Sequence, residues 1–363
     1  MVMPDLPLDL VDEILTRVPT TSLIRFRSAC KRWNSLFKES GFSEKQSRRA
    51  PKQHRVLMLK DDKLCFTRVN LKSVPPSIEF HEDALLTLKD TNSKQGYIDQ
   101  VQHCDGLLLC LTTDNRLVVW NPCLGQTRWI QSKNGCTSCY NKYHSYSLGY
   151  ENKQSCRSYK VLMFGSRINE FEIYELSSNS WRLVNAPKNL HRSGYSGVCL
   201  NGNTYWISRE YSDLICFDFT RERFIGLLCL PNPPHRRRRR AALSVFREEG
   251  VSKLCYTHFH DSGKVEMWVT NKIVDVEADL SWSKFAVVLL GPSVNFSAFT
   301  SLLTDEEKKV AVCCNFSPCP RRNNDEENPN LKDPWLQHFT HYGDGNWWPF
   351  LFNYVPSLVH IQS

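Results

Sequence analysis

The sequence lacks the long apolar runs and the leading segment of membrane and secreted proteins. No stretch of its 363 residues approaches the roughly 18 consecutive apolar residues of a membrane-spanning helix. The first residues, MVMPDLPLDLVDE, place acids where a secretion signal needs a basic region and an unbroken apolar run. We therefore expect a soluble intracellular protein without a membrane partner. Its 41% hydrophobic and 12% aromatic content can support one small module and one large core, or two medium cores.

The familiar signatures of enzymes are also missing. There is no GxSxG elbow, no GxxxxGKS/T phosphate loop and no HExxH pair, and Gly194–Gly197 lacks the final spacing of the elbow. The histidines are scattered, and His258 and His260 would equally well alternate along a solvent-facing strand edge. We therefore predict a chain that is not an enzyme and has neither a cofactor nor a metal site.

Cysteines at metal-binding or disulfide-scaffold spacing are scarce, although the chain has 15 cysteines. Their number is odd, and they are scattered through apolar, strand-like segments such as 106–111 and 310–314. Cys136 and Cys139 are the only pair separated by two residues, and no second pair at zinc-finger spacing follows. We predict that most of the cysteines are reduced core residues.

What the sequence does contain, at its start, is the pattern of an amphipathic helix. Apolar residues recur at helical period, with charged residues on the other face; the apolar stripe is Leu10, Val11, Ile14, Leu15 and Val18. Pro7 is tolerated in a first helical turn, and Pro19 ends the helix because proline has no backbone donor.

Two more short helices are predicted directly after Pro19. Thr20, Thr21 or Ser22 can cap the second, whose apolar positions are Leu23, Phe26 and Cys30. Trp33, Leu36 and Phe37 form one face of a third. Three helices of this size cannot bury all their apolar surface alone, so we expect a partner. The alternative is a helical cap whose apolar residues serve only its own core.

These residues carry a motif, LPxDLxxEILxRxPxxSLxRxRxxCKxW, that resembles an F-box. The match departs from the family at Ala29, where a larger aliphatic residue is common. The resemblance implies that this segment, residues 1–45, binds a Skp adaptor. The adaptor-binding residues that it implies are Leu6, Pro7, Leu10, Ile14, Leu15, Val18, Pro19, Leu23, Cys30 and Trp33.

From about His54 onward the pattern becomes that of an all-β domain, which we place at residues 46–363. A unit with an aromatic strand residue, a polar turn and a second aromatic or aliphatic strand recurs from anchors at Trp120, Tyr174, Phe217 and Trp268, at spacings of 54, 43 and 51 residues. Such periods are typical of β-propeller blades. With a unit before and a unit after these four, we predict about six blades; a β-sandwich is the alternative.

The all-β region resembles the F-box-associated interaction domain of plant F-box proteins, which is related to kelch-like propellers. The segments that carry the resemblance are Cys104–Leu108, Trp120–Pro122, Ser147–Tyr150, Tyr159–Val161, Gly197–Gly202, Tyr205–Trp206, Leu243–Phe246 and Tyr354–Val359. It implies strand and turn scaffold at these positions and assigns them no binding role.

A run of five arginines, Arg236, Arg237, Arg238, Arg239 and Arg240, follows a proline-rich turn. Adjacent guanidinium groups repel one another and cannot be buried without many anions, so we predict an exposed loop. A nuclear import signal, a phosphate-binding patch and a solvated insertion remain open. The run supplies five of the net eight positive charges, so the rest of the chain is close to balanced. A second polar insertion, Ser317–Asp333, is a candidate for contact with a partner.

As the resemblance implies, we expect the substrate-recognition subunit of an SCF-type cullin–RING ubiquitin ligase. The F-box would bind the Skp adaptor and through it cullin, and the β domain would bind a protein target that the sequence does not identify. We expect it in the nucleus and cytoplasm. The alternatives are a nucleic-acid-binding regulator that uses Arg236–Arg240, and recruitment of the adaptor outside a ligase.

Overall fold

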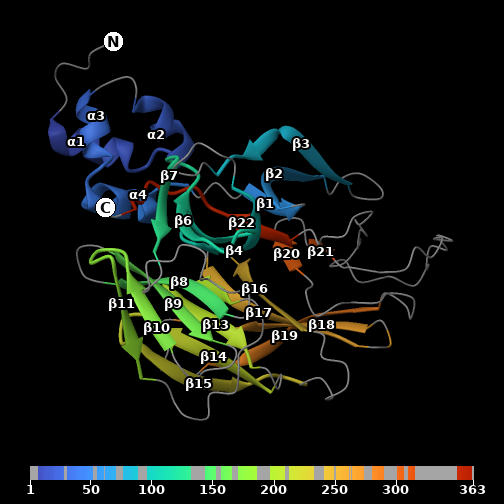
Figure 1. Ribbon diagram of the computed structural model, residues 1–363. Coiled ribbons are helices and arrows are strands. Elements are labelled where there is room, and N and C mark those ends of the chain that lie inside the picture. The colour runs from blue at the N-terminus through green and yellow to red at the C-terminus, as the bar shows by residue number, and fades with distance from the viewer. Residues whose placement is uncertain are drawn as a thin grey trace.

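The computed structural model describes residues 7–361 and shows a helical unit followed by an all-β unit (Figure 1). The described range has gaps at 28–30, 52–54, 61, 71–76, 89–95, 132–143, 153–156, 166–170, 186–196, 209–211, 233–240, 249–250, 261, 263, 274–279, 290–300, 306–309 and 315–349. No helix in these described ranges is long and apolar enough to cross a membrane.

The helical unit has four helices where the sequence predicts three. They are α1 (Leu8–Leu15), α2 (Thr20–Phe26), α3 (Lys31–Leu36) and α4 (Ser40–Arg49). The fourth helix lacks the apolar stripe of period 3.6; its described buried side chains are Phe42, Ser43 and Gln46. Phe42 packs against Phe37 with ring centroids 5.1 Å apart. Gln46, 2% exposed, donates to the Val18 carbonyl at 3.1 Å and to Thr20 Oγ1 at 3.0 Å.

Pro7 and Pro19 each stand immediately before a helix. Pro7 is the N-cap of α1 and Pro19 the N-cap of α2. The Pro19 carbonyl accepts hydrogen bonds from the backbone of Ser22 at 3.0 Å and of Leu23 at 3.2 Å. The prediction that Thr20, Thr21 or Ser22 caps α2 is therefore wrong. Pro19 occupies the N-cap position, and Thr20 is the first residue of the helix.

The described residues of the all-β unit form a propeller with five four-stranded antiparallel blades, so the predicted number of about six is wrong. The first blade has the order β22 (Phe350–Tyr354), β1 (Arg55–Lys60), β2 (Lys63–Asn70) and β3 (Ser77–Leu86). The second has β4 (Ile98–Cys104), β5 (Leu107–Thr112), β6 (Leu117–Asn121) and β7 (Gln126–Ile130). The third has β8 (His144–Asn152), β9 (Arg157–Gly165), β10 (Phe171–Glu175) and β11 (Ser180–Val184).

The remaining strands complete the ring. The fourth blade has β12 (Val198–Leu200), β13 (Asn203–Ile207), β14 (Asp213–Asp218) and β15 (Arg223–Cys229). The fifth has β16 (Ala241–Glu248), β17 (Val251–Phe259), β18 (Lys264–Thr270) and β19 (Trp282–Leu289). A two-stranded sheet, β20 (Ser301–Asp305) and β21 (Val310–Cys314), follows, and β20 contacts both β16 and β22.

The count differs from the sequence period for a topological reason. The last strand, β22, pairs with β1, so residues from the two ends of the propeller domain share one blade. The segments taken from the sequence as a first and a last unit therefore contribute together to the first blade. Between the fifth blade and this closing blade, the described residues form only the two-stranded sheet β20–β21.

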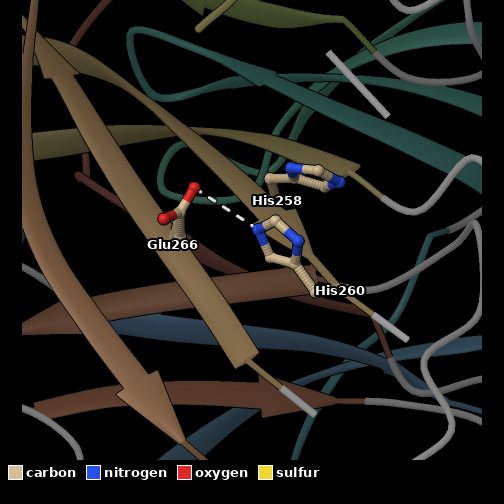
Figure 2. Close-up of side chains that lie close together, drawn as sticks. All are labelled: His258, His260 and Glu266. Carbon is tan, nitrogen blue, oxygen red and sulfur yellow. Dashed lines mark ion pairs between the residues drawn. The ribbon is translucent and has the colours of Figure 1, made fainter. Parts of the chain in front are cut away.

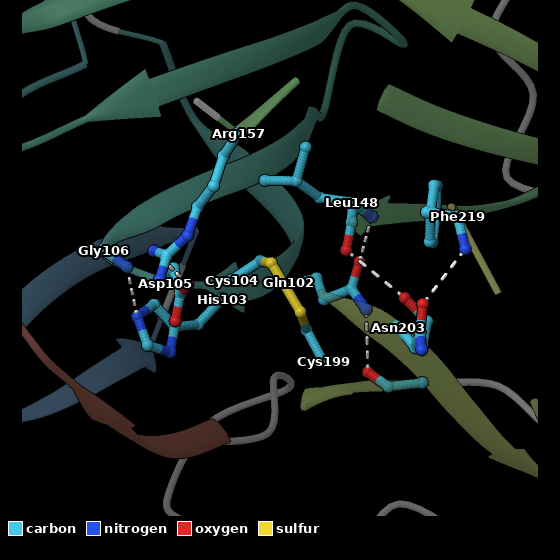
Figure 3. Close-up of a disulfide and its surroundings, with 12 residues drawn as sticks. Gln102, His103, Cys104, Asp105, Gly106, Leu148, Arg157, Cys199, Asn203 and Phe219 are labelled. Atoms are coloured by element: carbon cyan, nitrogen blue, oxygen red, sulfur yellow. Dashed lines mark hydrogen bonds and ion pairs between the residues drawn. A yellow bond between two sulfur atoms is a disulfide. The ribbon is translucent and has the colours of Figure 1, made fainter. Parts of the chain in front are cut away.

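Three successive blades are joined where β4, β8 and β12 lie close together (Figure 3). Gln102 of β4 donates to the Gly197 carbonyl at 3.2 Å and accepts from the Leu148 backbone at 2.7 Å. Cys104 and Cys199 form a disulfide across 95 residues of chain, so they are exceptions to the prediction that most of the cysteines are reduced. Cys65, Cys110, Cys123, Cys216, Cys229 and Cys255 are free cysteines.

A buried ion network joins the third and fourth blades. Lys160 of β9 is 4% exposed, and its Nζ lies 2.9 Å from Glu151 and 2.7 Å from Glu222. Glu222 belongs to the β14–β15 turn and also pairs with Arg182 of β11. Burial lowers the pKa of Lys160, but hydrogen bonds to Glu222 and Glu151 outweigh it and leave this pKa raised. Lys160 is therefore charged and fully paired.

Removal of this cation should destabilise the propeller strongly. We expect Lys160→Met to lower the free energy of unfolding by about 3–5 kcal/mol, because two carboxylates lose their buried partner. Urea denaturation measures the effect. Lys63→Met, which changes an exposed lysine of β2, is the matched control and should stay within about 0.5 kcal/mol of the parent chain. Equal effects of the two substitutions would contradict a cross-blade role for Lys160.

Candidate functional site: an apolar surface on the helical unit

Helix α1 divides its apolar stripe between two surroundings. Leu15 is 5% exposed and lies in the core of the helical unit, where Val11 and Val18 also pack. Leu10 and Ile14 of the same helix are 47% and 52% exposed. The stripe is therefore wider than the core that α1 covers, and two large aliphatic side chains remain in solvent.

Helices α2 and α3 add aromatic side chains. The rings of Phe26 and Trp33 have centroids 5.8 Å apart, and Phe26 is 38% exposed. Trp33 is half-buried and packs against the core of the helical unit. Leu10, Ile14 and Phe26 are thus the exposed large apolar side chains among the described residues of the helices, and we call them the apolar surface of the helical unit.

Ion pairs fix α1 to α4 on the polar side of α1. Asp12 pairs with Lys45 at 3.0 Å, and Glu13 pairs with both Arg17 and Arg49. Hydrogen bonds from Arg17 and then Arg49 hold the pKa of Glu13 below its ordinary value, so this carboxylate is ionised near neutral pH. Because α4 binds this polar side, Leu10 and Ile14 stay uncovered.

The core of the helical unit contains a residue from the far end of the chain. Its fully buried members are Leu15, Leu23, Phe37, Phe42 and Leu358. Leu358 is 1% exposed and belongs to the segment that follows β22. Figure 1 shows the C-terminal end of the chain beside α4.

The segment around Leu358 is held on the second blade by hydrogen bonds. Asn121 of β6 donates through Nδ2 to the carbonyls of Ser357 at 3.1 Å and Val359 at 2.7 Å. Gln126 of β7 accepts from the Ile361 backbone at 3.2 Å. Burial, and then the charge of Arg27, lower the pKa of His360 in the same segment. The segment, residues 355–361, therefore connects the helical core to the propeller, and we call it the C-terminal strap.

The structure assigns different positions to the residues implied as adaptor contacts. Pro7, Leu10 and Ile14 are exposed, while Val18, Pro19 and Trp33 are half-buried. Leu15 and Leu23 are buried inside the helical unit. Leu6 and Cys30 lie outside the described residues, as do Arg236–Arg240 and Ser317–Asp333. Sequence reasoning missed the strap; the possible signal was the apolar Leu358 in a short segment after the last strand.

His258, in β17, and His260, directly after this strand, are placed differently from the expectation. β17 lies between β16 and β18, so it is not an edge strand, and His258 is 6% exposed. The interpretation of a solvent-facing strand edge is therefore wrong, because the hairpin partner β18 covers this strand.

Comparison with known protein families agrees with both units. Residues 3–45 match the F-box domain, and residues 55–361 match the F-box associated beta propeller domain. The chain belongs to the F-box proteins with a C-terminal F-box associated β-propeller domain. The F-box match ends within α4, and the propeller match includes the strap.

Relatives of this F-box protein span its full length. A putative F-box/kelch-repeat protein of Arabidopsis thaliana is 44% identical over 380 residues, covering 100% of this chain and 98% of the relative. A putative F-box only protein 9 of the same plant is 42% identical, covering 99% and 96%. An F-box/kelch-repeat protein of this plant is 40% identical, covering 100% and 97%.

Proposed function

We propose that this F-box protein is the substrate-recognition subunit of an SCF-type cullin–RING ubiquitin ligase. The observation that carries the proposal is the apolar surface of the helical unit. Leu10 and Ile14 are about half exposed, although the core beneath them is already filled by Leu15 and its neighbours. Large aliphatic side chains left in solvent beside a complete core favour a surface that another protein covers, and the F-box family supplies the Skp adaptor as that protein.

The energetics require more than these two residues. Full burial of a large aliphatic side chain contributes about 1.5–3 kcal/mol, whereas association costs about 4–15 kcal/mol in lost freedom. Pro7, Val18 and Trp33 are accessible enough to contribute to the same interface. Leu15 and Leu23 contribute to this interface indirectly, because they pack in the core of the helical unit and hold α1 and α2 in position.

The propeller is the proposed target-binding unit. The helical unit contacts one end of it: Leu124, in the β6–β7 turn, packs on the helical core, and Gly106, in the β4–β5 turn, lies against Ser357. Because strands alternate in direction within each blade, the C-terminal ends of β5, β9, β13 and β17 lie at the opposite end of the propeller. Loops on a rigid scaffold usually carry binding residues, so we place the target at this opposite end.

Such a subunit needs no catalytic residue of its own. It would raise the effective concentration of the target near a ubiquitin-charged conjugating enzyme, so tethering replaces a dilute encounter. The C-terminal strap supports this role, because it fixes the helical unit to the propeller through Leu358 and Asn121. A rigid connection keeps the distance from adaptor to target constant.

The cellular location of the protein and the alternative function of nucleic-acid binding remain predictions. Nuclear and cytoplasmic location rests on Arg236–Arg240, which lie outside the described residues. The nucleic-acid-binding alternative depends on the same run, and nothing in the described ranges adds support to it.

Co-expression tests the proposal. We expect the chain to co-elute with a Skp adaptor and a cullin as one stoichiometric complex in gel filtration, and to lose both when the helical residues 1–50 are removed. An isolated propeller that still carries the adaptor, or a full chain that elutes alone at micromolar concentration, would refute it.

A further inference from the structure

Two histidines and a glutamate lie together at the β17–β18 hairpin (Figure 2). One donor atom from each of His258, His260 and Glu266 lies within 4.8 Å of the other two. Glu266 is 1% exposed and His258 is 6% exposed, while the side chain of His260 is 29% exposed. The cluster is therefore largely enclosed, with one opening to solvent beside His260.

Backbone pairing places these three side chains. His258 of β17 stands directly opposite Glu266 of β18 in the antiparallel register. His260 follows two residues later, so it lies on the same side of the strand as His258, and their ring centroids are 4.1 Å apart. The hairpin is closed by a hydrogen bond from the His260 backbone to the Lys264 carbonyl at 2.8 Å. The cluster thus stands on rigid elements and not on a long loop.

The two oxygens of Glu266 have different surroundings. Oε1 accepts ion pairs from Lys264 at 2.7 Å and Lys284 at 3.1 Å. Oε2 faces His260 Nε2 at 3.3 Å and Asn232 Nδ2 at 3.1 Å. Burial raises the pKa of Glu266, but hydrogen bonds from Lys264 and then Asn232 outweigh it and hold the pKa far below its ordinary value. Oε2, and not Oε1, therefore lies on the imidazole side of the carboxylate.

We propose that His258, His260 and Glu266 form a binding site for Zn²⁺ or a similar divalent transition metal ion. One ring nitrogen of each histidine and Oε2 of Glu266 would be the ligands, and the side open at His260 leaves room for a water or a partner's side chain as a fourth. Imidazole with carboxylate suits zinc, copper and nickel, whereas magnesium and calcium prefer oxygen ligands alone. Three protein ligands with one open position form a known zinc arrangement.

The two lysines determine how tightly the metal is held. Their ammonium groups repel a cation, so they weaken the site, but both bind Oε1 and leave Oε2 to the metal. Their side chains are 38% and 42% exposed, so they can turn into water when the ion enters. Water screens partly exposed ion pairs such as these, so the entering metal ion loses little when the two ammonium groups move away. The lysines therefore weaken the proposed site without blocking Oε2, and their removal should strengthen metal binding.

Cobalt titration of the full chain tests the site. Co²⁺ is chosen because the chain has 15 cysteines, and a thiolate ligand adds an intense charge-transfer band that histidine and carboxylate ligands do not. We expect one Co²⁺ bound without that band, affinity at least tenfold weaker in His260→Ala, and affinity at least tenfold tighter in Lys264→Gln with Lys284→Gln. His260 is half-exposed, so its substitution should leave the fold intact.

The matched control removes two positive charges elsewhere, at the exposed Lys63 and Lys272, by substitution with glutamine. Its cobalt affinity should stay within about twofold of the parent chain, because exposed charges beyond about 10 Å are screened. Binding that is unchanged in His260→Ala, a thiolate band that this substitution does not remove, or equal affinities of the two lysine double variants would each overturn the proposal. Adaptor binding is measured in parallel and does not depend on this outcome.

Discussion

Leu10→Ala together with Ile14→Ala should weaken Skp adaptor binding by about 10-fold to 100-fold while the helical unit and the propeller stay folded. Both side chains are about half exposed in the free chain, so their truncation removes little from the core. Full burial of a large aliphatic side chain is worth about 1.5–3 kcal/mol, and about half of each side chain remains to be buried. The combined loss of about 1.5–3 kcal/mol corresponds to about one to two decades in affinity. Calorimetric titration of purified adaptor measures the change, with thermal unfolding as the check on folding.

The propeller offers a matched control for this result. Leu183 of β11 and Leu289 of β19 are 63% and 62% exposed, so Leu183→Ala with Leu289→Ala removes similar exposed apolar surface away from the helices. We expect adaptor affinity within about twofold of the parent chain. Similar losses in both double variants would mean that the apolar surface of the helical unit is not the adaptor contact.

Substitution of Leu15 should give a different result from substitution of Leu10, although the sequence predicts both as adaptor contacts in one apolar stripe. Leu15 is 5% exposed in the helical core, so its truncation destabilises the F-box by about 2–5 kcal/mol and reduces binding only through unfolding. The sequence cannot separate the two positions, because an amphipathic stripe indicates apolar surface but not which part of it a neighbouring helix covers.

The fourth helix could not be predicted from hydrophobic periodicity. Helix α4 has one buried aromatic, Phe42, and one buried amide, Gln46, among polar residues. A stripe of period 3.6 is absent, so the pattern that predicts α1 gives no signal here. The helix is held by tertiary contacts, chiefly the hydrogen bonds of Gln46 to Val18 and Thr20 and the ion pairs to α1.

The propeller was predictable because its repeats are local. Trp120, Tyr174 and Phe217 mark equivalent strands, and all are buried. The number of blades was not, since β22 pairs with β1 across almost 300 residues and no local pattern encodes that pairing. The disulfide between Cys104 and Cys199 and the ion network of Lys160 join neighbouring or facing blades, and they follow from the closed ring and not from sequence spacing.

Leu358→Ala should loosen the F-box although it lies more than 300 residues from α4 in the chain. Leu358 is 1% exposed among Leu15, Leu23, Phe37 and Phe42, so its truncation leaves a cavity in a small core. Such cavities cost about 2–5 kcal/mol, which is a large part of the stability of a unit this small. Hydrogen exchange measures the effect: amides of α1–α4 should exchange faster, while amides of the β5 and β9 strands keep their protection.

The same strap supplies the control that decides this last prediction. Val359 and Ile361 are partly buried against the propeller core, whereas Leu358 enters the helical core. We expect Val359→Ala to leave exchange in α1–α4 unchanged and to preserve adaptor affinity.

Leu358→Ala should weaken adaptor binding in proportion to the fraction of F-box that unfolds, since only the folded fraction binds. If the amides of α1–α4 exchange equally slowly in both variants, the helical core is complete without Leu358 and the strap is only a surface contact. If these amides exchange faster in Leu358→Ala alone, adaptor binding by the helical unit depends on the last residues of the propeller domain.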